Sequence, residues 1–163
     1  MSREDYPAEN FIGKTFLGID FGEKVIGMSI FRYGSDPFPL LNGRINVYKG
    51  DDPFKLIKEI VENDLVNYII LGIPYLTDGK ESAMTHKVIS FGKELASKIP
   101  EVTIIHQDET LSTYEAEERM KNDPKFNFKV DLQRIDEMSA CIIMEQFFSE
   151  RVTSNPTDEG SQE

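Results

Sequence analysis

The sequence predicts an α/β domain built on a mixed five-stranded sheet with helices on both faces. Three hydrophobic strands come first, over residues 15–21, 24–32 and 40–49, and their short connections indicate an antiparallel meander. Two further apolar strands, at 67–72 and 102–106, alternate with helical segments, which is the pattern of parallel βα units. A meander joined to βα units requires a sheet of mixed direction with helices on each side.

The first strand carries an acid within a hydrophobic run. Alternation places Leu17, Ile19 and Phe21 on one face, and Phe16, Gly18, Asp20 and Gly22 on the other. Burying an acid costs free energy unless a partner is present, and the adjacent glycines leave room for a ligand or another backbone. Asp20 therefore has two interpretations: a cap for the turn before Glu23 and Lys24, or a carboxylate that handles metal or phosphate.

The third strand contains an irregular dipeptide and is followed by a helix start. Asn42-Gly43 indicates either a bulge or an alternative turn. Asp52 has the position of an N-cap, with Pro53 in the first turn. The apolar stripe of this helix is predicted at Phe54, Ile57, Ile60 and Val61.

Three more helices follow in the second half of the chain. One is predicted over about 82–98, and the last runs from Asp131 or nearby to about Phe148. Between them, Ser112 and Glu115 have the spacing of a capping box, which predicts a short helix over about 113–121.

Length and cysteine usage indicate one domain in a reducing compartment. The 163 residues are enough for a single domain with a sizeable core, flanked by a flexible leader at 1–14 and a disordered acidic tail at 151–163. No run of about twenty apolar residues predicts a membrane span, and the N-terminus lacks the apolar stretch of a signal peptide. The single cysteine, Cys141, excludes an intrachain disulfide and a multi-cysteine zinc site. We therefore expect a cytoplasmic protein.

The net charge of −11 argues against a protein that binds nucleic acid through an overall basic surface. It does not exclude a nuclease, because clustered metal-binding carboxylates also make a chain acidic. The best candidate for a local basic patch interleaves lysine and arginine with aromatic residues, at Lys121, Lys125, Phe126, Phe128, Lys129 and Arg134. The alternative is a solvated loop whose two phenylalanines pack on the core.

Acids occupy three unusual places, where they could converge at one edge of the sheet. Asp20 lies within a strand, Asp108 and Glu109 follow the 102–106 strand, and Asp136 lies near the start of the last helix on its apolar stripe. Singly, the later acids could serve only to stabilise helix N-termini. Three converging carboxylates suit Mg²⁺ or Mn²⁺, and the longer side chain favours Glu109 over Asp108 as the third ligand.

Four segments resemble the YqgF (RuvX) family, in the order that the family has them. They read GIDFGxKxIGMS from Gly18, ILGIPYxxDG from Ile70, DETLSTxxA from Asp108 and IDxxSAxII from Ile135. The resemblance implies a ribonuclease-H-like nuclease domain over residues 15–150 in a cytoplasmic bacterial protein. It also implies a Mg²⁺- or Mn²⁺-dependent nuclease linked to 5′-end processing of pre-16S rRNA. Members of the family were earlier proposed to resolve Holliday junctions.

By position, the family's acidic residues fall on Asp20, Glu109 and Asp136. Two positions depart from the family pattern, because Val25 and Thr110 stand where basic residues are usual. Both departures remove positive charge near the expected phosphate backbone and leave Lys24 alone in its turn. These losses and the acidic charge favour, as the alternative, a non-catalytic module of the same fold that binds RNA or protein.

Overall fold

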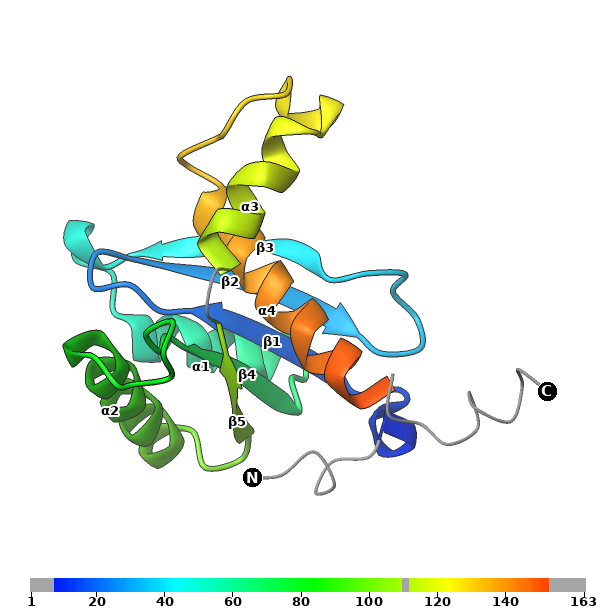
Figure 1. The fold of residues 1–163 in the computed structure, drawn as a ribbon. Coiled ribbons are helices and arrows are strands. Elements are labelled where there is room, and N and C mark those ends of the chain that lie inside the picture. The colour runs from blue at the N-terminus through cyan, green and yellow to red at the C-terminus, as the bar shows by residue number, and fades with distance from the viewer. Residues whose placement is uncertain (1–7, 110–111, 153–163) are drawn as a thin grey trace.

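A single five-stranded sheet, in the order β3-β2-β1-β4-β5, forms the centre of the molecule (Figure 1). The computed structural model describes residues 8–109 and 112–152. The first three strands pair antiparallel, and the last two run parallel to the first. The strands are β1 (Thr15–Asp20), β2 (Val25–Arg32), β3 (Leu40–Asn46), β4 (Tyr68–Ile73) and β5 (Thr103–Asp108). The predicted mixed sheet is confirmed, although β3 is shorter than expected and passes into a 3-10 turn, η3 (Val47–Lys49).

Helices cover both faces of the sheet, as the sequence predicts. α1 (Pro53–Asn63) and α2 (Ala83–Lys98) lie on one face, and α4 (Ile135–Val152) crosses the other (Figure 1). α3 (Ser112–Lys121) packs on α4 and projects past the sheet, followed by η4 (Pro124–Phe126). Within the described part of the chain, no helix has the length and apolar character needed to cross a membrane.

The alternation along β1 divides its side chains between two core layers. Leu17 and Ile19 are fully buried against α1 and α2. Phe16 is fully buried in the layer beneath α4, which is rich in aromatic rings. Gly18, on the same side as Phe16, lets α4 approach closely, and Ser29 beside it donates a hydrogen bond to the main-chain carbonyl of Ala140 at 2.8 Å. The face predicted to carry Asp20 is thus the α4 face.

The predicted start of α1 and the irregularity in β3 are both confirmed. Asp52 caps α1 by accepting a hydrogen bond from the Phe54 amide at 3.1 Å. In β3, Asn42 and Gly43 together oppose the single residue Met28, because Arg44 pairs with Gly27 and Leu41 with Ser29. This two-against-one arrangement is a β-bulge.

The segment before β1 differs from the flexible leader that the sequence predicts for 1–14. Residues 8–11 form a 3-10 turn, η2 (Ala8–Phe11), and Phe11 is only 1% exposed. Its ring packs against Phe16, Tyr68, Phe147 and Phe148, at centroid distances from 5.1 to 6.0 Å. One buried ring in so short a segment creates no periodic pattern, so the sequence does not reveal this contact. Residues 1–7 and the expected tail from residue 153 onward lie outside the described residues.

Phe11→Ala is expected to reduce the free energy of unfolding by about 3–5 kcal/mol, because it empties a fully buried aromatic site. Urea denaturation measures this change. Ile12→Ala is the matched control, since Ile12 is the next residue and is 66% exposed. Its effect should stay within about 0.5 kcal/mol. Equal stability of the two variants would show that η2 does not anchor the chain to the core.

Candidate active site

Asp20 ends β1 between two glycines on the neighbouring strands. On β2, Gly27 pairs directly with Asp20. On β4, Gly72 lies one residue beyond Leu71, which pairs with Ile19. Residues that lie opposite one another on adjacent strands share a face of the sheet. The α4 face therefore has no side chain on either side of Asp20.

The space above each glycine is filled by another part of the site. A Cβ atom on Gly27 would collide with the main-chain carbonyl of Asp136, in the first turn of α4. A Cβ atom on Gly72 would lie 3.0 Å from Oε2 of Glu109. The glycines thus allow Asp136 and Glu109 to approach Asp20 from opposite sides.

The carboxyl groups of Asp20 and Glu109 are hydrogen-bonded to one another. One of the two must carry a proton, because an ionised carboxylate has no hydrogen to donate. Burial raises the pKa of Asp20 well above its usual range, and the charge and hydrogen bond of Glu109 and the charge of Asp136 raise it further. Asp20 still keeps some exposure, whereas Glu109 is 8% exposed.

Asp136 is close to this pair without joining it. Its side chain is half-buried, and burial raises its pKa while the charge of Arg44 opposes the rise. Ala140, Ile143 and Phe147, on the same stripe of α4, are fully buried, as predicted. Among the residues that the structure describes, no group of three or more His, Cys, Asp or Glu side chains is arranged to hold a metal ion. The three predicted acids thus share one place, with Asp20 and Glu109 in contact and Asp136 within electrostatic reach.

The structure places Glu109, and not Asp108, against Asp20. Asp108 is the last residue of β5, is exposed and borders a cavity of about 300 Å³ beside α4. Glu109 follows it and occupies the inward position, since Ile105 and Gln107 in the same alternation are also buried. Thr110 lies outside the described residues, as does the side chain of the predicted helix cap Ser112.

Two of the predicted nucleic-acid-binding residues line a groove beside the start of α4. Lys125 and Arg134 border a cavity of about 590 Å³, where the Arg134 guanidinium lies 5.7 Å from the centre of the Phe126 ring. Phe126 packs on the small core between α3 and α4, as the alternative interpretation of this loop expects. Phe128 is 62% exposed, so that interpretation holds for only one of the two rings.

The other two basic residues of this patch lie outside the groove lining. Lys121 forms an ion pair with Glu118 at 3.5 Å. Lys129 is exposed in the loop before α4.

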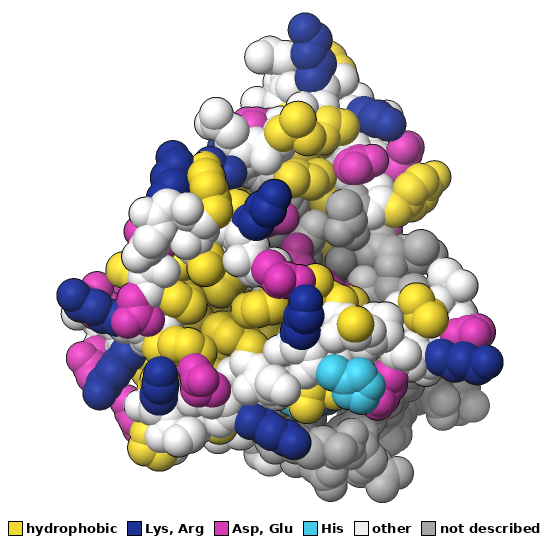
Figure 2. Space-filling view, turned by 90° about the vertical axis from the view of Figure 1, so that its left-hand side faces the viewer, with side chains coloured by type: hydrophobic (Ala, Val, Ile, Leu, Met, Phe, Trp, Pro, Cys, Tyr) yellow, Lys and Arg dark blue, Asp and Glu magenta, His cyan; other side chains and the backbone are white. Residues whose placement is uncertain are grey.

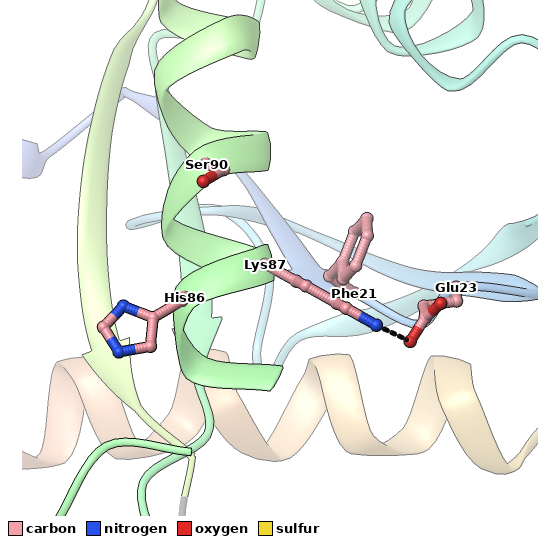
Figure 3. A pocket seen from close by; sticks show the side chains of 5 residues that line it. All are labelled: Phe21, Glu23, His86, Lys87 and Ser90. Carbon is pink, nitrogen blue, oxygen red and sulfur yellow. Dashed lines mark hydrogen bonds and ion pairs between the residues drawn. The ribbon is translucent and has the colours of Figure 1, made fainter. Parts of the chain in front are cut away.

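Lys24 is exposed in the turn that follows Asp20. The neighbouring Glu23 accepts a hydrogen bond from Lys87 of α2 at 2.8 Å, at the edge of a pocket of about 510 Å³ (Figure 3). Phe21 borders the same pocket and packs on Phe91 with a centroid distance of 4.6 Å, so this pocket lies on the α2 side of the sheet. Figure 2 views the end of the molecule to which this turn points. Basic side chains there are separated by acidic ones and surround a hydrophobic centre, without forming a continuous basic band.

Sequence reasoning missed Arg44, whose charge acts on Asp136. The only signal in the sequence is the Asn42-Gly43 dipeptide directly before it. A regular strand and a bulged strand point this arginine to opposite faces, so its place depends on which of the two occurs.

Comparison with known proteins identifies the family. A family model described as "RuvX: Holliday junction resolvase" matches residues 14–150. A relative from Shewanella oneidensis, named "Putative pre-16S rRNA nuclease", is 32% identical over 136 residues, which cover 83% of this chain and 94% of that one. A protein of the same name from Thermus thermophilus is 29% identical over 133 residues, covering 80% and 94% of the two chains.

Solved structures support the fold. RuvC from T. thermophilus, in complex with a Holliday junction substrate, superposes with a TM-score of 0.54 at 10% identity, covering 88% of this chain and 99% of that one. The yeast mitochondrial Holliday junction resolvase Ydc2 gives a TM-score of 0.50 at 12% identity, covering 93% and 86%. At such identities the likeness concerns the fold alone. The family match spans nearly all of the described sheet and helices, and the chain therefore belongs to the RuvX family of nucleases.

Proposed function

We propose that this protein is a metal-dependent endonuclease that hydrolyses phosphodiester bonds in structured RNA, with the precursor of 16S rRNA as its substrate. The observation that carries the proposal is the contact between Asp20 and Glu109, in a gap that two glycines open on the α4 face. The family provides the reaction class, and the names of the relatives favour the RNA substrate.

Asp20 and Glu109 offer the oxygen donors that a hard divalent cation binds, although the described acids are not arranged around one common position in this structure. Two carboxyl groups in contact can share one proton or one cation, and a cation removes the cost of ionising both. Asp20 and Glu109 would hold Mg²⁺ or Mn²⁺, with Asp136 as the third oxygen donor. When bound, such a cation stabilises the negative charge that develops on the phosphate during hydrolysis.

The chain's own residues would position the nucleic acid over this pair. Gly27 and Gly72 let Asp136 and Glu109 lie close to Asp20, where the phosphodiester would be held. Lys125 and Arg134, at the groove beside the start of α4, would meet phosphates while the Phe126 ring offers a surface for a base. Lys24 would bind a phosphate at the turn after Asp20, and the exposed Lys121 and Lys129 would contribute charge at a greater distance.

We also propose a cytoplasmic location, which suits a chain whose single cysteine allows no intrachain disulfide. The one cysteine, Cys141, is 4% exposed, and burial raises the pKa of its thiol to about 12. A thiol that stays protonated and covered is a core residue, and it needs no disulfide partner.

Cleavage of purified pre-16S rRNA and of a four-way DNA junction, each with and without Mn²⁺, tests the assignment. We expect cleavage of the RNA that depends on Mn²⁺, with the junction left intact. Cleavage of the junction alone would support the second candidate, a Holliday-junction resolvase, which the description of the family model favours.

A third outcome would indicate a non-catalytic binding module. In that case neither substrate is cut, and Mn²⁺ does not raise the melting temperature. A ligand that binds the native state must stabilise it, so the melting experiment separates an inactive preparation from a protein without a metal site.

A further inference from the structure

We propose that Arg44 binds a phosphate group of the nucleic-acid substrate, and that the bulge in β3 exists to aim this arginine at the active site. The inference rests on the proposed function, because it assigns a further residue to the same site. It adds a cation to a place where the sequence predicts only acids.

The bulge determines which face Arg44 occupies. Leu41 packs on the small core of α3 and α4, whereas Ile45 is 1% exposed in the core beneath α1 and α2. In a regular strand, residues four apart face the same side. Leu41 and Ile45 face opposite sides because Asn42 and Gly43 together oppose one residue of β2. Without the extra residue, Leu41 and Arg44 would lie on opposite faces.

Pairing with β2 brings Arg44 into line with the acids. Arg44 pairs with Gly27, which in turn pairs with Asp20, so the three residues form a row across the sheet on the α4 face. Gly27 has no side chain, and the first turn of α4 with Asp136 lies over it. Arg44 is therefore next to Asp136 on the side away from Glu109, and its charge opposes the rise in the pKa of Asp136.

The helix turn that carries Asp136 also fixes the bulge. The amide of Gly43 donates a hydrogen bond to Oε2 of Glu137 at 3.2 Å, and Glu137 is 8% exposed. Gly43 has φ of +84°, a left-handed conformation that favours glycine. The bulge that precedes Arg44 is thus hydrogen-bonded to the turn of α4 that carries Asp136, and this bond fixes the two main-chain segments relative to one another.

The guanidinium of Arg44 has capacity for a ligand. Arg44 is half-buried, and it forms no ion pair with any residue in the described ranges 8–109 and 112–152. Its planar donors match the oxygens of a phosphate. A polyanion that approaches three carboxylates needs a cation nearby to offset the repulsion, and Arg44 provides one on the same face. The alternative is a structural role, in which Arg44 offsets the charge of Glu59 and Asp64. These two acids and Arg44 border one cavity of about 280 Å³ between β3 and α1.

Binding of a fluorescein-labelled RNA that spans the 5′ end of 16S rRNA tests the proposal. Fluorescence anisotropy is measured at several salt concentrations in the Asp20→Asn background, where cleavage does not consume the probe. Adding Arg44→Ala should weaken binding about 10-fold and reduce the slope of log K against log salt by about 1, since one phosphate contact is lost. Arg44→Lys should recover part of the affinity and the slope, because it keeps the charge but not the paired donors.

Lys58→Ala is the matched control, since it removes one positive charge from the exposed side of α1, on the opposite face of the sheet. It should change neither the affinity nor the slope. Melting temperatures of all variants should agree. A lower melting temperature for Arg44→Ala with an unchanged salt slope would assign Arg44 a structural role beside Glu59 and Asp64, and the proposal would be wrong.

The binding assay tests the role of Arg44, and the cleavage assay tests the nuclease assignment, so each claim can be refuted without the other. No binding of the RNA, or binding that does not depend on Arg44, overturns the role of Arg44 even if the wild-type protein cleaves RNA. Binding that depends on Arg44, in a protein whose wild type cleaves nothing, supports this phosphate site and overturns the nuclease assignment instead.

Discussion

Asp20→Asn is expected to lower the cleavage rate on the order of 10³-fold and, at neutral pH, to raise the melting temperature of the metal-free protein. The loss of activity follows from removing one of the two carboxylates that would hold the cation. The gain in stability follows from the environment of Asp20, where burial and the neighbouring acids Glu109 and Asp136 raise its pKa. The folded protein therefore resists ionisation of this group, and an amide does not ionise.

The raised pKa of Asp20 determines whether the stability of the fold rises or falls with pH. The pKa of Asp20 is higher in the folded than in the unfolded state, so the folded state holds its proton more tightly. Stability of the wild type therefore falls as pH rises from about 4, the unfolded pKa, through the folded pKa. Asp20→Asn removes this dependence, and its advantage in melting temperature should grow over that range and then stay constant.

Asp108→Asn is the control for this experiment, because Asp108 is an exposed acid at the end of β5. Its activity should equal that of the wild type, and its melting temperature should show no comparable gain. Wild-type turnover by Asp20→Asn would remove Asp20 from the metal site. A melting temperature for Asp20→Asn below that of the wild type throughout the pH range would show that the carboxyl group stabilises the metal-free fold.

Gly27→Ala is expected to inactivate the enzyme and to destabilise the fold by about 3 kcal/mol. The added Cβ would collide with the main chain of Asp136, so the first turn of α4 must move away from β2. Overpacking of a well-packed site typically costs roughly 1–3 kcal/mol, and a main-chain neighbour cannot escape by changing its rotamer. The displacement also separates Asp136 from Asp20 and Arg44, which stay in the sheet. Urea denaturation and the RNA cleavage assay measure the two effects.

Gly72→Ala is the comparison for Gly27→Ala. A Cβ at Gly72 would approach the side chains of Glu109 and Ile143, and side chains can shift. Its cost in stability should therefore be smaller, although activity should fall because Glu109 moves. Equal stability of the two variants would show that the start of α4 adapts to a methyl group above Gly27.

The sheet could be predicted from the sequence because its signals are local. Alternation along β1, the apolar run of β4 and the Asp52-Pro53 helix start each depend on a few adjacent residues, and each is confirmed. The start of α4 was predicted less accurately, because the predicted start at Asp131 or nearby precedes the observed start at Ile135. The burial of Phe11 could not be predicted, since three of the four rings that it contacts lie more than fifty residues away in the chain.

The candidate site was also predicted only in part, because the facing of single side chains depends on strand register and on the bulge. The convergence of Asp20 and Glu109 follows from topology, because parallel strands bring their carboxyl ends to one edge of the sheet. Which acid of the Asp108-Glu109 pair faces Asp20 depends on the register of β5, which sequence reasoning addresses only through side-chain length. The position of Arg44 depends on the bulge, and one extra residue in a strand reverses the face of everything that follows it.

The most direct test of the metal-dependent nuclease is the rate of Mn²⁺-dependent pre-16S rRNA cleavage by Glu109→Gln and by Asp108→Asn, measured side by side. The two substitutions are adjacent and remove the same charge, but only Glu109 is buried and contacts Asp20. We predict that Glu109→Gln loses cleavage on the order of 10³-fold while Asp108→Asn cleaves like the wild type. Full activity of Glu109→Gln, with or without loss of activity in Asp108→Asn, would contradict the assignment of the Asp20–Glu109 pair as the centre of catalysis.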